Sequence, residues 1–90
     1  GFSTADLTDK QKQELELDGG VLVSRMASGA AAQAGVRKGD IILAIDNKPV
    51  MDVAQFDKTV KGLPGGKSVA LLVQRNGSPT FLAIKVPADE

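Results

Sequence analysis

Short apolar stretches, each followed by turn-forming residues, limit most strongly how this chain can fold. Residues 21–26, 41–45, 68–74 and 80–86 have the length and composition of buried or half-buried β-strands. The Asn-Gly pair at 76–77 separates the last two stretches and is typical of the tight turn in a β-hairpin. No apolar run approaches the ~20 residues that a membrane-spanning helix needs, so we expect no membrane insertion.

Short helices are expected between these strands, at residues 9–15, 30–34 and 53–61. Each follows residues that can satisfy the orphan backbone amides at a helix start. These capping residues are Thr8 with Gln11, Ser28, and Asp52 with Gln55. The last helix carries an apolar stripe at helical spacing, made of Val53, Phe56 and Val60.

The order of the elements favours a mostly antiparallel sheet. Residues 2–7 are expected to be extended, and Val50-Met51 to form a two-residue strand after a turn at 46–49. Strict parallel β-α-β repetition fits poorly, because two of the connections are short turns. The predicted fold class is α+β, mainly β, with five to six strands capped by two or three helices.

The amino-acid composition argues against several classes of function. Eleven basic residues balance eleven acidic ones, and three phenylalanines are the only aromatics, so a nucleic-acid-binding face is not expected. The sequence has no cysteine, which excludes disulfide scaffolds, thiol nucleophiles and cysteine-rich zinc sites. It has no histidine either, which removes the commonest acid/base residue and metal ligand. We therefore expect neither a cofactor nor a metal.

A hydrolytic site made by this chain alone is not expected. A triad needs a nucleophile, a base and an orienting group, and without histidine only a lysine could act as base for the serines. A surface serine near a lysine is common by chance. The later acidic residues show no metal-ligand spacing, and we interpret them as turn, cap and helix-surface residues. These residues are Asp40, Asp46, Asp52 and Asp57.

Residues 28–50 form the most specific pattern, SGAAAQAGVRKGDIILAIDNKPV. A small-residue helix is followed by Ala-Gly-Val, Gly-Asp and a buried strand, and this order resembles the middle of a PDZ domain. A helix at 9–15 before the strand at Val21, and the 63–67 link after the long helix, resemble the PDZ domains of bacterial HtrA/Deg serine proteases. Residues 2–9 are similar to the opening of the second PDZ domain in that group. The resemblance implies a partly open antiparallel β-sandwich or barrel over residues 1–86, with a loose tail at 87–90.

The resemblance also implies a function, which is the binding of extended peptides or C-termini between a strand and the long helix. The peptide adds a strand to the sheet edge, and a glycine-containing loop presents backbone amides to the terminal carboxylate. The residues implied for this role are Gly1, Phe2, Ser3, Thr4 and Ala5 on the strand side, and Phe56, Thr59 and Val60 on the helix side. No histidine starts the helix, so ligands with apolar C-termini are expected.

Several alternatives stay open at this point. Phe56 and Val60 fit a purely structural core equally well, Phe2 fits a strand residue without a ligand role, and Gly1 fits a tag remnant. The chain is expected to be a piece of a longer periplasmic serine protease, with the protease domain as a partner. In that protein it would deliver peptides or unfolded segments, or regulate the protease. An assembly role in the same protease is the second hypothesis, and a PDZ domain of another envelope protein is the third.

Overall fold

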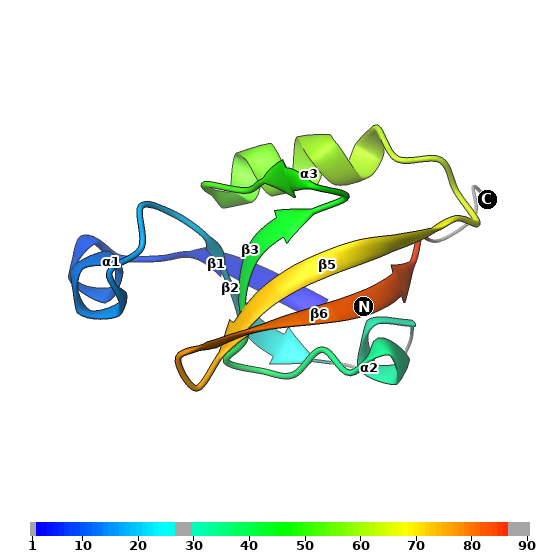
Figure 1. Cartoon of the computed structure of the whole chain (residues 1–90). Helices are drawn as coiled ribbons and strands as arrows, with labels where there is room; N and C mark the ends of the chain where they lie inside the picture. The colour runs from blue at the N-terminus through cyan, green and yellow to red at the C-terminus, as the bar shows by residue number, and fades with distance from the viewer. Residues whose placement is uncertain (1, 27–29, 87–90) are drawn as a thin grey trace.

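The computed structural model describes residues 2–26 and 30–86. The elements, in chain order, are β1 (Phe2–Asp6), α1 (Asp9–Leu15), β2 (Val21–Met26), α2 (Ala30–Ala34), β3 (Ile41–Ile45), β4 (Lys48–Pro49), α3 (Val53–Lys61), β5 (Ser68–Arg75) and β6 (Ser78–Lys85). The described strands pair antiparallel in the order β1-β2-β3-β5-β6, with β4 paired to β3 (Figure 1). The predicted mainly β fold, with short helices around one sheet, is confirmed.

Local signals placed most of these elements correctly. The capping box of α1 is present, because Gln11 N–H donates to Thr8 Oγ1 at 3.1 Å and Thr8 N–H donates to Gln11 Oε1 at 2.9 Å. Asn76 and Gly77 both have positive φ, at 51° and 80°, and they connect Arg75 to its partner Ser78. The strands of this hairpin therefore continue to the turn itself, one residue further than predicted on β5 and two on β6.

The predicted two-residue strand at Val50-Met51 is wrong, because β4 is Lys48–Pro49. Asp46 and Asn47 take left-handed conformations, at φ 52° and 63°, and make a tighter turn than the expected four residues. Ile45 consequently pairs with Lys48, and β4 begins directly after the turn. The Ser28 cap and the tail at 87–90 lie outside the described residues.

The core lies between the inner face of the sheet and α3. Alternate residues of β5 point into it, and Val69, Leu71 and Val73 are all buried. On β6 the same alternation turns Leu82 and Ile84 toward the core and leaves Phe81 exposed, and Val86, directly after the strand, is buried. The remaining buried cluster consists of Val21, Val23, Val36, Ile42, Ile45, Val50 and Phe56. The sheet thus has one face that is closed by α3 and another that is open.

Candidate functional site

Strand β1 lies at an edge of the sheet, since β2 is its only neighbour in the described strand order. The pairing runs from Phe2 opposite Met26 to Asp6 opposite Val21, with a register shift between Ser3 and Thr4. On an edge strand, half of the backbone N–H and C=O groups point away from the sheet, where another extended chain can bond to them. The position of β1 therefore provides the backbone template that strand addition needs.

Helix α3 lies alongside β1 and contacts it. The two elements run in opposite directions, so the start of α3 is near the end of β1 (Figure 1). The Val53 N–H donates to Asp6 Oδ1 at 2.8 Å and fixes this end. At ordinary spacing, the five residues of β1 span roughly 13 Å and the nine of α3 roughly 12 Å. The strand and the helix are thus matched in length.

The predicted helix residues occupy different environments. Phe56 is only 7% exposed and belongs to the core cluster, whereas Val60 and Thr59 are half-buried. Val53 and Val60 are partly buried and pack against the edge of the core cluster. On β1, Ser3 is exposed, and Thr4 and Ala5 are half-buried. Gly1 and the Phe2 side chain lie outside the described residues, so their predicted roles stay predictions, as does the role of each residue named here.

Three side chains accept hydrogen bonds from the backbone at the start of α3, and they belong to Asp52, Gln55 and Asp6. Gln55 N–H donates to Asp52 Oδ1 at 2.8 Å, which confirms the predicted cap. The Gln55 side chain reaches one residue further back than a capping box requires and accepts from Met51 N–H at 2.8 Å. The third contact, from Asp6, was missed in the sequence. Asp6 lies 47 positions before Val53, and no local pattern signals such a contact.

A second missed feature is a buried ion pair between Asp40 and Arg75. Asp40 is 2% exposed and accepts hydrogen bonds from Arg75 at 2.8 and 2.5 Å and from Arg37 N–H at 2.9 Å. Arg75 also donates to the Gly35 carbonyl at 2.7 Å. Burial by itself raises the pKa of Asp40, but the hydrogen bonds and positive charges of the two arginines outweigh it and hold that pKa below its usual value. The hydrogen bond to Asp40 raises the pKa of Arg75.

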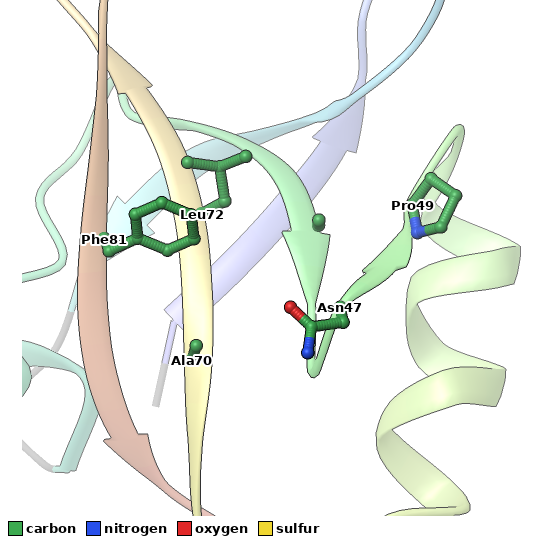
Figure 2. Close-up of a pocket in the computed structure, with 6 residues that line it drawn as sticks. Asn47, Pro49, Ala70, Leu72 and Phe81 are labelled. Carbon is green, nitrogen blue, oxygen red and sulfur yellow. The ribbon is translucent and has the colours of Figure 1, made fainter.

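An apolar hollow of about 210 Å³ lies on the face of the sheet that carries Leu72 and Phe81 (Figure 2). Its lining residues are Ala44, Asn47, Pro49, Ala70, Leu72 and Phe81. Phe81 is 70% exposed and lies opposite Leu72 on the neighbouring strand. No residue of β1 or α3 lines this hollow, so it is separate from the predicted groove.

Residues 2–26 and 30–86 contain neither a candidate metal site nor a candidate membrane-spanning helix. No group of three or more acidic side chains lies close enough together there to hold a metal ion. No helix in this part of the chain has the length and apolarity that spanning a membrane requires.

Comparison with known sequences identifies the family. The sequence model of the PDZ domain matches residues 22–75. A probable periplasmic serine endoprotease, DegP-like, from Hahella chejuensis is 44% identical over 81 residues, which cover 90% of this chain and 17% of that protein. A protein of the same description from Pseudomonas putida is 40% identical over 86 residues, covering 96% of this chain and 18% of the relative. The chain thus spans less than a fifth of these relatives.

Solved structures agree with this assignment. A variant of the HtrA-type protease AlgW, determined with a decapeptide, superposes with a TM-score of 0.91 at 28% identity, covering 100% of this chain and 28% of that one. The PDZ domain of HtrA3, bound to a phage-derived ligand, has the same fold, with a TM-score of 0.79 at 22% identity over 94% of this chain and 80% of that one. The chain therefore belongs to the PDZ domain family, and it is similar to the PDZ regions of DegP-like and HtrA-type proteases.

Proposed function

We propose that this chain is the peptide-binding module of an HtrA/DegP-type periplasmic serine protease. In this role it holds an extended peptide against β1 and α3, while hydrolysis takes place in another domain of the parent protein. The observation that carries the proposal is the edge position of β1 among the described strands, with β1 joined to α3 by the Asp6–Val53 hydrogen bond. The periplasmic location agrees with the names of the relatives.

The dimensions of β1 and α3 support a short peptide segment as the ligand. A groove of roughly 13 Å matches about five residues of an extended chain, the same number as in β1, with neighbouring residues about 3.3 Å apart. Hydrogen bonds to the backbone of β1 provide affinity that does not depend on the peptide sequence. Side chains alternate along the bound strand, so every second one points toward the body of the domain and meets α3 or the core beneath it.

An apolar C-terminus is the peptide end that fits these residues best. Val53 and Val60 border the core on α3, and neither side chain can form a hydrogen bond. With valine at the first position of α3, no helix side chain there selects a serine or threonine in the ligand. Because the helix runs opposite to β1, Val60 lies toward the Phe2 end, where the carboxylate loop is predicted.

Peptide titration watched by the amide resonances of the labelled domain tests the proposal. Three decapeptides of otherwise identical sequence end in valine, in aspartate and in valine amide. We expect saturable shifts at residues 3–6 and 53–60, with the free valine terminus binding most tightly. The proposal is wrong if no peptide moves these resonances, or if the shifts centre on Phe81 and Leu72 instead.

The hollow around Phe81 favours a second candidate role, which is contact with another subunit or domain of the parent protein. A contiguous exposed apolar patch is typical of a surface that meets a partner, and here Phe81, which is 70% exposed, lines an apolar hollow together with Leu72 and Pro49. Sizing the full-length protein with and without Phe81→Ser separates the two roles. Loss of assembly with unchanged peptide affinity would support the assembly role.

A further inference from the structure

The contact between Asp6 and α3 joins the two walls of the proposed groove. Asp6 is the last residue of β1, and its Oδ1 accepts the Val53 N–H at 2.8 Å. Val53 is the first residue of α3, so this N–H has no partner within the helix itself. Asp52, the helix's own cap, bonds to Gln55 and not to Val53. A strand residue therefore completes the cap of a helix that lies far away in sequence.

The charge of Asp6 suits this position. The N-terminus of a helix carries a partial positive charge, and a carboxylate that accepts a backbone N–H there forms a charge-assisted hydrogen bond. The contact therefore stabilises one arrangement of the helix relative to the strand as well as the helix itself.

The C-terminal end of α3 has no comparable hydrogen bond to β1 among the described residues. Between the described side chains of residues 59–61 and β1, no hydrogen bond or ion pair is present. The last turn of α3 is held by half-buried Val60 and Leu63 against the core and by its own backbone capping at Gly62. Packing of this kind tolerates small displacements better than a directional hydrogen bond does.

We propose that Asp6 is a positioning residue that holds the groove at binding width at one end and lets α3 pivot at the other. The inference depends on the proposed peptide-binding function. The pivoting end is the Val60 end, where the last side chain of the ligand would enter, so the groove adjusts there to side chains of different size. Without Asp6, a smaller fraction of molecules has α3 at the right distance from β1, and the apparent affinity falls by that fraction.

Substitution of Asp6 in the intact domain tests the proposal, with peptide affinity, stability and hydrogen exchange as readouts. Asp6→Ala removes the acceptor, and Asp6→Asn keeps an oxygen that can accept the Val53 N–H. Thr8→Ala is the matched control, because it removes a capping-box bond from α1, which is outside the groove. We expect Asp6→Ala to weaken binding of valine-ended decapeptides about three- to tenfold, which is the range expected for loss of one such hydrogen bond. We expect Thr8→Ala to stay within about twofold of the unchanged protein, and Asp6→Asn to fall between that control and Asp6→Ala, because it keeps an acceptor and loses the charge.

Hydrogen exchange at the Val53 amide reports on the contact separately from binding. Faster exchange of Val53 in Asp6→Ala, together with weaker binding that Asp6→Asn partly restores, supports the positioning role. Unchanged affinity in Asp6→Ala overturns it, and so does an equal loss of affinity in Thr8→Ala, because the effect would then follow from general destabilisation. If the unchanged domain binds no peptide, the proposed function fails as well, and the exchange rates still tell whether the Asp6–Val53 contact exists in solution.

Discussion

Replacing Arg75 by methionine should destabilise the fold in a way that depends on pH. Methionine keeps much of the apolar stem and removes the charge, which leaves Asp40 buried with only the Arg37 N–H as a described partner. Removing one member of a buried ion pair costs about 3–5 kcal/mol. Because 24% of the Arg75 side chain is exposed, water solvates part of the pair, and we expect about 2–3 kcal/mol at pH 7. For a domain of this size, that corresponds to a fall in Tm of roughly 8–24 °C.

The sign of the pH dependence distinguishes this mechanism from simple loss of packing. In the unchanged protein the pKa of Asp40 is lowered on folding, so its contribution is fully present above the unfolded pKa of about 3.9 and is lost as pH falls through the lower, folded pKa. In the variant, burial remains and the cation is gone, so the pKa of Asp40 should rise above its ordinary value. Protonation then stabilises the variant as pH falls, and the difference between the two proteins shrinks toward pH 4.

Urea unfolding followed by circular dichroism at pH 7, 5.5 and 4 measures both effects. Lys38→Met is the matched control, since it removes a positive charge from an exposed side chain of the same turn, and Lys38 does not contribute to the lowered pKa of Asp40. We expect that control to stay within about 0.5 kcal/mol. A loss below about 1 kcal/mol for Arg75→Met at pH 7, or an equal loss at pH 4 and pH 7, would refute this account of the pair.

Three other substitutions test separate parts of the structure. Phe56→Ala should cost about 3–5 kcal/mol in urea unfolding, because the ring is 7% exposed, and a small loss would show that Phe56 is not a core residue. Gly20→Ala should cost about 1–3 kcal/mol or more in the same assay, since φ is +139° and the new Cβ would lie 2.9 Å from Ile41 Cγ2; near-neutral behaviour would contradict this geometry. Phe81→Ser should change the free energy of unfolding by no more than about 0.5 kcal/mol, and a large loss in thermal unfolding would mean that the ring is packed in solution.

The sequence predicted best those elements whose signals are local. Thr8 with Gln11 and the Asn76-Gly77 turn depend on residues within a few positions of one another, and their geometry is nearly independent of the rest of the fold. The position of β4 was missed for a related reason. Asp46 and Asn47 both adopt left-handed conformations, and their composition indicates a turn without saying how many residues it uses.

The apolar stripe on α3 shows that helical periodicity predicts which residues share a face but not what that face contacts. Helical spacing identifies Val53, Phe56 and Val60 as one face, but it does not say whether that face meets the core, a ligand or both. In the structure the three side chains differ in burial. Phe56 lies inside the core, and the two valines are half-buried at its edge. That difference depends on the distance and tilt of α3 relative to the sheet, which are set by other elements.

The Asp6–Val53 hydrogen bond joins α3 to β1, and long-range polar contacts of this kind could not be found by sequence reasoning. Asp6 and Val53 are separated by 47 positions, and Asp40 and Arg75 by 35. Each aspartate has an ordinary local interpretation, at a strand end or in a turn, and solvated charge is the usual state of such residues. Their partners become visible only when the sheet has brought the elements together. Asp6 accepts a backbone N–H at the start of α3, and Asp40 accepts from the Arg37 backbone and the Arg75 side chain. A carboxylate thus joins α3 to β1 at Asp6, and an ion pair joins the 37–40 turn to the β5–β6 hairpin at Asp40. The groove therefore depends on a tertiary contact that any substitution scan confined to the predicted binding residues would leave untouched.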